Sequence, residues 1–371
     1  MADQWPDINN KNISSTTKKM WIPNVISQVV FQMPMMAKLY LNGRVKKEWD
    51  GGTLITRPTQ IARMEDLAQD VTAESQLTGG RKTLLETPSF RWKKFQLPIT
   101  FSDEEATMNS GPNRVIDFSK YLVEKGFEGA RIHLYELMYN SAGSAGDADA
   151  SADESTDTNK KFQSVIQALD HGDSSSDIGY AYGNITRDIS AGTNDAFQSA
   201  DIEDGFAGSG TTSNQGTEIT ASLSNFRKAV GVVRRNAEPR DQFLCEVGPT
   251  LYQAFQSIVQ AGLTTNTTVS QRGGLVNYGF NSFTLDGIEI VENPYLRNSN
   301  ISNSHKWFFL YDINTWEMRF KPGNMFRLTD FFDQSVIREG YMLHLARIWC
   351  EGNFMCWAPN RNLWLSNMVV G

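Results

Sequence analysis

The chain has 371 residues, of which 40% are hydrophobic and 21% charged, a length for which about two domains are expected. Its formal net charge of -7, from 35 basic and 42 acidic residues, excludes a uniformly basic nucleic-acid-binding protein, so any nucleic-acid contact must be local. Three cysteines, Cys245, Cys350 and Cys356, form no CxxC pair, which argues against a disulfide framework and against a structural zinc site.

The N-terminal region is polar and locally basic. It contains no apolar run of signal-peptide length, and no later stretch approaches a membrane span, so we expect a chain that folds in a cytoplasm without membrane contact. Seven basic residues stand against four acids in the first fifty, a local net charge of +3. The basic residues are Lys11, Lys18, Lys19, Lys38, Arg44, Lys46 and Lys47. A solvated face explains this pattern as well as an intermolecular contact does.

Residues 49–101 are predicted to form a long two-armed β-hairpin, because apolar and polar residues alternate in 53–57 and again in 90–99. The middle, 65–75, is polar and acidic, so the hairpin has a thin core and is only marginally stable alone. Its second arm carries Arg81, Lys82, Arg91, Lys93 and Lys94 against Glu86, a net charge of +4. We therefore expect the hairpin to lean on another surface, such as another chain.

A long amphipathic helix is predicted over 113–139, where apolar residues recur at intervals of three and four after Pro112. Gly126 and Gly129 each cost about 1 kcal/mol relative to alanine inside a helix, so a close neighbour is expected there. The next segment, 141–220, holds 14 acids against 3 basic residues, a net of -11 that leaves +4 for the rest of the chain. Its composition predicts long surface loops with one docked short helix at 162–169.

Helices and strands are then predicted to alternate. The helices cover 223–233 and Pro249 to Ala261, the second ending before Gly262. The strands cover 242–247, a pair in 283–291 turning near Asp286-Gly287, 307–311 and 316–320. Residues 341–370, rich in Trp, Leu, Ile and Met, are predicted to form a final hairpin that turns at Gly352 and Asn353 and is packed on both faces.

No catalytic, cofactor or metal site is predicted. Four histidines, His133, His171, His305 and His344, fall in four different predicted elements without a metal-binding spacing. The stretch 79–83 (GGRKT) lacks the first glycine of a phosphate-binding loop and precedes a strand. The sequence Ser102-Asp103-Glu104-Glu105 is typical of a helix cap. A soluble α+β enzyme using Asp103, Glu104 and Glu105 near a cleft remains an alternative.

Several short stretches carry a family resemblance. They are Trp49-Asp50-Gly51-Gly52, Phe90-Arg91-Trp92-Lys93-Lys94, Asn109-Ser110-Gly111 before Val115-Ile116-Asp117, Tyr182-Gly183-Asn184-Ile185-Thr186-Arg187, and Cys356-Trp357-Ala358-Pro359-Asn360-Arg361-Asn362. In this order, and over nearly its whole length, the chain resembles the major capsid proteins of tailed bacteriophages. Asn184 departs from the tyrosine-glycine-glycine-isoleucine-x-arginine stretch of many such proteins.

The resemblance implies an α+β chain with the Hong Kong phage-type capsid fold. On this sequence it implies an N-terminal arm at 1–48, an extended loop (E-loop) at 49–105, and a first part of the peripheral (P) domain at 106–221. That part would contain the spine helix 114–139 and the acidic insertion 141–220. An axial (A) domain would follow at 222–321, and the P domain would return at 322–371 with a terminal β-hairpin.

The function implied by the resemblance is self-assembly as hexamers and pentamers into an icosahedral shell around the double-stranded DNA of a tailed phage. Such a protein is not an enzyme, uses no cofactor, resides in the virion and is assembled in the host bacterial cytoplasm. The E-loop would contact a neighbouring subunit through Arg81, Lys82, Phe90, Arg91, Trp92, Lys93 and Lys94. Basic contacts of the arm, non-specific where they meet packaged DNA, would come from Lys18, Lys19, Arg44, Lys46 and Lys47.

Other family features stay open at this point. Only about twenty polar residues precede Trp21, which favours a separate scaffolding protein, beside a portal and a decoration or cement protein. Some family members cross-link an E-loop lysine to an asparagine, and Lys82, Lys93 or Lys94 could meet Asn360, Asn362 or Asn367. The shell of an encapsulin-type bacterial nanocompartment is the alternative on the same fold, although the long Gly/Asp/Ser segment favours the phage.

Overall fold

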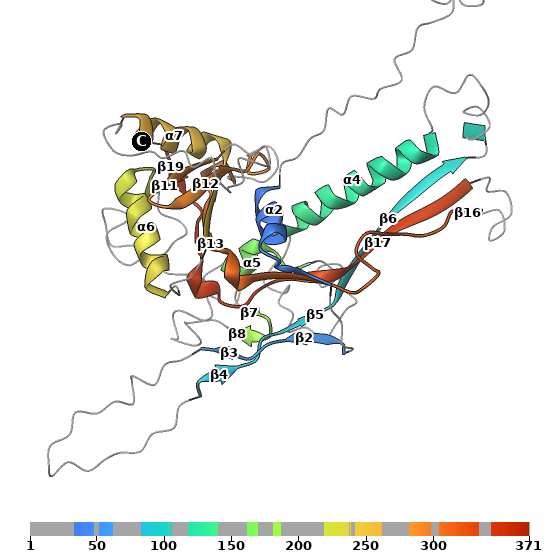
Figure 1. Ribbon diagram of the computed structural model, residues 1–371, viewed down its shortest axis with the longest axis horizontal. Helices are drawn as coiled ribbons and strands as arrows, with labels where there is room; N and C mark the ends of the chain where they lie inside the picture. The colour runs from blue at the N-terminus through green and yellow to red at the C-terminus, as the bar shows by residue number, and fades with distance from the viewer. Residues whose placement is uncertain are drawn as a thin grey trace, which may run out of the picture.

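The computed structural model describes residues 33–47, 52–61, 83–102, 104–105, 118–139, 162–169, 181–186, 219–236, 238, 242–261, 282–297, 304–333 and 343–370. Two sheets and one long helix make up most of this part of the chain (Figure 1). The predictions for Lys18, Lys19, Arg81, Lys82, Asp103, the spine positions 114–117 and most of the acidic insertion lie outside the described residues.

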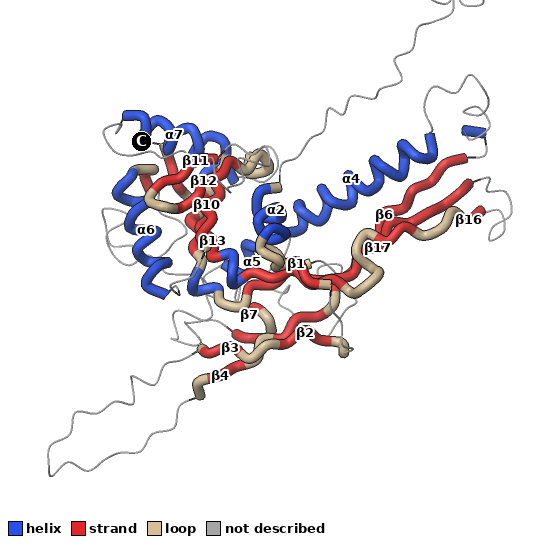
Figure 2. Tube along the Cα trace, viewed as in Figure 1, coloured by secondary structure: helices blue, strands red, loops and turns tan. Residues whose placement is uncertain are grey.

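A six-stranded sheet is built around β17 (Leu343–Cys356), a strand of 14 residues. Along ten residues β17 pairs antiparallel with β6 (Lys93–Ser102), so that the two strands form a long strip (Figure 2). The other members are β1 (Val45–Lys46), β14 (Trp316–Phe320), β15 (Arg327–Leu328) and β16 (Phe332–Asp333). β6, the C-terminal part of the predicted E-loop 49–105, is thus paired along its length with β17.

The long helix α4 (Phe118–Tyr139) lies along this strip (Figure 1). A Cβ atom on Gly126 would lie 2.6 Å from Ile99 Cδ1 and 3.0 Å from Ile348 Cδ1, so the close neighbour expected there is confirmed. At Gly129 the nearest side-chain atom is 3.9 Å away, which leaves room for a Cβ. None of the described helices is both long and apolar enough to cross a membrane.

A five-stranded sheet forms the second half of the body. Its order is β11 (Ser282–Leu285), β12 (Ile288–Glu292), β10 (Phe243–Val247), β13 (Phe308–Asp312) and β18 (Leu363–Leu365). The predicted helices are confirmed as α6 (Leu223–Asn236) and α7 (Pro249–Ala261), which cover one face. The turn between β11 and β12 consists of Asp286 and Gly287, whose φ angles of 49° and 80° are those of a two-residue hairpin turn.

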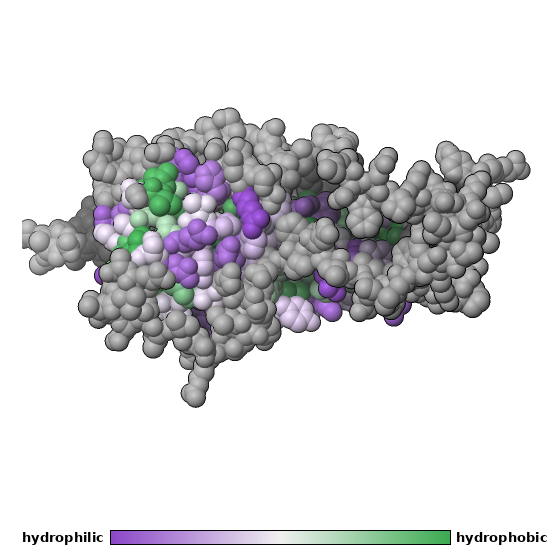
Figure 3. Space-filling model, turned by 90° about the horizontal axis from the view of Figure 1, so that it is seen from above, coloured by the Kyte–Doolittle hydropathy of each residue, from purple (hydrophilic) through white to green (hydrophobic). Residues whose placement is uncertain are grey.

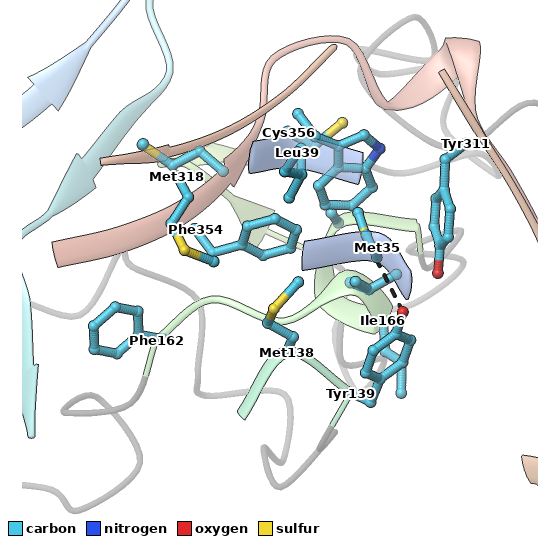
Figure 4. Packing of buried hydrophobic residues seen from close by; sticks show 14 of the residues in the cluster. Met35, Leu39, Met138, Tyr139, Phe162, Ile166, Tyr311, Met318, Phe354 and Cys356 are labelled. Carbon is cyan, nitrogen blue, oxygen red and sulfur yellow. Dashed lines mark hydrogen bonds between the residues drawn. The ribbon is translucent and has the colours of Figure 1, made fainter. Parts of the chain in front are cut away.

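The opposite face of the five-stranded sheet joins the main core. There α2 (Pro34–Leu41), the end of α4 and α5 (Val165–Leu169) pack together, and Figure 4 shows Met35, Leu39 and Ile166 between the strands and α4. The short helix α5 was predicted, and reciprocal hydrogen bonds of 3.0 and 3.1 Å between Ser164 and Gln167 form its capping box. The core therefore connects both sheets with helices from the first half of the chain.

Small sheets and short 3₁₀ helices complete the fold. The strand pairs are β2 (Leu54–Thr56) with β5 (Ser89–Arg91), β3 (Thr59–Gln60) with β4 (Leu85–Glu86), β7 (Ala181–Tyr182) with β8 (Ile185–Thr186), and β9 (Ile219–Thr220) with β19 (Met368–Val369). The 3₁₀ helices are η5 (Ser304–Lys306), η6 (Ile313–Thr315) and η8 (Pro359–Arg361).

The predicted terminal hairpin at 341–370 is wrong. β17 runs without a turn through Gly352 and Asn353 because Gly352 lies opposite Phe320 of β14, where a Cβ would be only 2.7 Å from the Phe320 ring. After β17 the chain crosses to the other sheet, where β18 pairs with β13. Conversely, β14 lies in the six-stranded sheet although 316–320 was predicted within the axial domain, because η6 redirects the chain after β13.

Gly352→Ala is expected to destabilise the subunit by about 1 to 3 kcal/mol, the usual cost of forcing an extra carbon into a packed site. The matched control is Gly231→Ala in α6, where a Cβ would meet no atom within 4 Å and alanine favours the helix by about 1 kcal/mol. Urea denaturation of the purified subunit measures both changes. Equal stability of the two variants would contradict the close packing of Gly352 against β14.

Candidate assembly surfaces

The base of the projecting hairpin is anchored inside its own subunit. Ile55 of β2 pairs with Phe90 of β5, and Phe90 is 0% exposed. The Phe90 ring packs edge-on against Tyr182 and Trp357, with centroid distances of 5.1 and 5.4 Å. This aromatic cluster gives the base of the hairpin an apolar cover within its own subunit.

The β7–β8 turn braces the same base. Gly183 and Asn184 have φ angles of 58° and 65°, a conformation that glycine and asparagine adopt most readily. The Gly183 carbonyl accepts from the Ser89 backbone N–H at 2.8 Å, and the Asn184 amide donates to the Ser89 hydroxyl at 2.8 Å. Asn184, the residue that departs from the resemblance, therefore adopts a left-handed turn conformation and adds a side-chain bond to the hairpin.

The predicted E-loop contacts are only partly available to a neighbour. Phe90 is fully buried and Lys93 is 7% exposed, so both are excluded as intersubunit contacts of the folded subunit. Lys93 is buried because the register of β6 places this residue opposite Gly352 of β17. Arg91 and Trp92 are half-buried, and Lys94 is exposed.

The exposed apolar residues of the hairpin were missed by the sequence reasoning. Leu54 on β2 is 44% exposed and Leu85 on β4 is 61% exposed. The alternation in 54–56 carried a signal, because it places Ile55 and Leu54 on opposite faces of one strand. With Ile55 buried, Leu54 must point to solvent. Leu54 and Leu85, called the hairpin leucines below, are its uncovered apolar side chains in the described residues.

Other exposed apolar residues lie at the ends of helices and strands. Tyr40 and Leu41 end α2, Phe331 precedes β16, and Val370 follows β19. On the face seen from above, small apolar patches lie among polar residues (Figure 3). The hairpin leucines are thus part of a scattered apolar surface, and they differ from the rest in lying on a projecting two-stranded element.

The described part of the predicted N-terminal arm is docked on the body. Met35 and Leu39 of α2 are fully buried, and β1 pairs in parallel with β14. Arg44 donates to the Asn314 side chain at 2.7 Å, and Lys46 lies 3.5 Å from a Glu317 carboxylate oxygen. Arg44 and Lys46 therefore bind within the subunit, a correction to their prediction as outward contacts.

One carboxylate of the enzyme alternative, Glu105, belongs to a local cap. Ser102 N–H donates to Glu105 at 2.9 Å, and Glu105 N–H donates to the Ser102 hydroxyl at 3.1 Å, which confirms the capping sequence. Glu104 and Glu105 are both exposed. Within the described ranges no three His, Cys, Asp or Glu side chains are placed to hold a metal ion, and the three cysteines are buried without a disulfide.

Asn362, considered as a cross-linking partner, is a buried structural residue. Its side-chain oxygen accepts from the Asp312 N–H at 2.9 Å and from the Trp316 indole at 2.8 Å. Its amide donates to the Thr315 hydroxyl and to the Ala358 carbonyl, both at 2.9 Å. Asn362 thus ties the end of β13 to the start of β14, and neither it nor Lys93 is accessible for a cross-link.

A spine helix along a two-stranded strip, a projecting hairpin, and a second sheet covered by two helices together define the Hong Kong phage-type capsid fold, in the α+β class. Solved capsid structures share this fold at low sequence identity. The cyanophage A-1(L) capsid aligns with a TM-score of 0.62 and 11% identity, covering 96% of this chain and 98% of its own.

Two further capsids agree with this assignment. The capsid of the native GTA particle aligns with a TM-score of 0.54 and 8% identity over 96% of each chain. The mature capsid of bacteriophage PhiM1 aligns with a TM-score of 0.50 and 10% identity, covering 95% of this chain and 92% of that one. By sequence alone, no family model and no curated protein matches the chain.

Proposed function

We propose that this chain is the major capsid protein of a tailed phage, which self-assembles as hexamers and pentamers into an icosahedral shell around double-stranded DNA. The observation that carries the proposal is the agreement of fold with a cyanophage capsid over 96% of this chain. The role is structural, without catalysis. The protein would reside in the virion after assembly in the host cytoplasm.

The two sheets correspond in this proposal to the two domains of a capsid subunit. The six-stranded sheet with α4 is the peripheral domain, and the five-stranded sheet with α6 and α7 is the axial domain. The hairpin of β2 to β5 reaches a neighbouring subunit. Its contact surface comprises the hairpin leucines together with Arg91, Trp92 and Lys94, which the fold leaves at least partly exposed.

The same function implies further partners. They are a separate scaffolding protein, a portal, and a decoration or cement protein. Packaged DNA would be contacted non-specifically by basic side chains that the fold does not engage, of which Lys47 is exposed and Lys18 and Lys19 remain candidates from the sequence.

Negative-stain electron microscopy of the purified chain tests the proposal. We expect rings or shells, formed by the chain alone or after coexpression with a scaffolding protein. Analytical ultracentrifugation would show the matching shift from subunit to large particles. A chain that stays monomeric at high concentration in both preparations would refute the capsid assignment.

A further inference from the structure

A fully buried carboxyl group lies where the N-terminal helix, the spine helix and the five-stranded sheet meet. Glu246 of β10 is 0% exposed, and it was overlooked in the predicted apolar strand 242–247. Successive β10 side chains face opposite cores, so that Cys245 and Val247 point to α6 and α7. Glu246 therefore points to α2 and α4.

Two side-chain donors converge on this carboxyl group. The Tyr139 hydroxyl, at the end of α4, donates to Glu246 Oε2. The Asn293 amide donates to the same oxygen at 3.4 Å. The Met35 backbone N–H and the Tyr311 hydroxyl also face the carboxyl and lower its pKa. Tyr139 lies close to α2 itself, with its hydroxyl 3.7 Å from the Met35 sulfur (Figure 4). The other oxygen, Oε1, has no hydrogen-bond partner in the described part of the chain.

The N-terminal turn of α2 faces this carboxyl and has no side-chain cap of its own. Pro34 occupies the first turn of α2, and Met33 at the N-cap makes no side-chain hydrogen bond, so the N–H groups of the first turn need an outside acceptor. The Glu246 carboxyl faces this turn from β10. A second tie joins Lys38 of α2 to Glu289 of β12 at 2.7 Å. Two acidic side chains of the five-stranded sheet, Glu246 and Glu289, thus face α2.

Among the described residues, titratable groups surround Glu246 but no cation is paired with it. Tyr135 and Tyr139 face it from α4, Tyr311 from β13, and Cys245 precedes it on β10. Burial first, and the negative charge of Glu246 second, raise the pKa of all four well above their ordinary values. On α2 the only lysine, Lys38, is paired with Glu289. An ionised Glu246 is thus stabilised only by dipoles.

We propose that Glu246 is a proton-controlled latch, which holds α2 on the five-stranded sheet when the carboxyl is neutral and releases α2 when the carboxyl ionises. Release would free residues 33–47, which otherwise bridge the two sheets through α2 and β1. The latch needs only the folded subunit, and it goes beyond the proposed shell function.

The direction of the pH dependence follows from the pKa of Glu246 in the docked and the open state of α2. Burial raises the pKa of Glu246 from 4.5 to about 7, against hydrogen bonds from Tyr139 and Asn293 that lower it. When α2 opens, water reaches the carboxyl and its pKa returns toward 4.5. Docking is therefore strongest below pH 4.5 and weakens as the pH rises through about 7. Between pH 5.5 and 8.5 the two values correspond to about a 30-fold increase in opening.

Hydrogen exchange of the full chain, followed by mass spectrometry with labelling times corrected for intrinsic rates, measures this opening. Peptides that cover α2 should lose protection about 30-fold between pH 5.5 and 8.5, while those of α6 should not. Glu246→Gln should make the protection of α2 independent of pH. Tyr139→Phe removes a donor that lowers the pKa, so it should move the midpoint to higher pH.

The matched control is Glu289→Gln, which removes the Lys38 pair. It should lower the protection of α2 at every pH and leave the pH dependence intact. Protection of α2 that does not change with pH in the wild type would overturn the latch, as would an unchanged profile in Glu246→Gln. If that variant does not fold, an unmoved midpoint in Tyr139→Phe overturns it. A loss of protection in α6 that parallels the loss in α2 would also overturn the latch, because the whole subunit would then be opening.

Discussion

Replacing both hairpin leucines by aspartate, Leu54→Asp with Leu85→Asp, is expected to abolish shell assembly while the subunit stays folded. The two side chains are 44% and 61% exposed in the single subunit, so two surface substitutions should change its free energy of unfolding by about 0.5 kcal/mol or less each. In a contact between copies the same positions would lose water, and each unpaired carboxylate would cost several kcal/mol. Negative-stain microscopy and analytical ultracentrifugation measure the particles, and circular dichroism the fold.

The control is the double substitution of the hairpin leucines by methionine. Methionine has a similar volume and remains apolar, so particles should form in near wild-type yield. Particles of unchanged yield and stability from the aspartate variant would show that the hairpin leucines stay in solvent in the shell. That result would contradict only the hairpin contact. The capsid proposal would still depend on the microscopy of the unmodified chain.

Asn362→Ala is expected to destabilise the subunit by about 3 to 5 kcal/mol. The substitution leaves the Asp312 N–H and the Trp316 indole N–H without the acceptor that they share, and each buried unsatisfied group costs about 1 to 3 kcal/mol. It also removes the donor to the Thr315 hydroxyl and the Ala358 carbonyl. Urea denaturation of the unassembled subunit gives the free energy of unfolding.

Asn360→Ala is the matched control, because Asn360 belongs to the same 3₁₀ helix but is partly exposed. We expect its effect to stay within about 1 kcal/mol. An Asn362 variant as stable as the Asn360 variant would contradict the role of Asn362 in holding the two sheets together.

Elements with local signals could be predicted from the sequence. For α7, Pro249 sits at the first turn, a position where its missing N–H is harmless. The β11–β12 hairpin turns at Asp286 and Gly287, residues that tolerate a positive φ. The spine helix, α5 and α6 follow from the periodicity of their apolar residues. Each signal acts within one or two turns of the chain, so no distant partner is needed.

The candidate site was predicted less well than the fold. A row of basic and aromatic residues at 90–94 indicated a contact surface, but Phe90 and Lys93 are buried. Their burial depends on Tyr182, Trp357 and the register of β6 on β17, which are far away in the sequence. The hairpin leucines became recognisable only once the buried face of the hairpin was known.

The sequence by itself determined the order of the helices, the hairpin with its thin core, the concentration of acid in 141–220, and the resemblance that pointed to a capsid fold. Only the tertiary structure decided that β17 continues through Gly352 and Asn353, that β13 and β14 belong to different sheets, and that Glu246 is buried beside α2. The physical reason is shared by all three. Strand pairing and burial depend on partners that are distant in the chain, whereas helical periodicity, caps and turns depend on neighbouring residues.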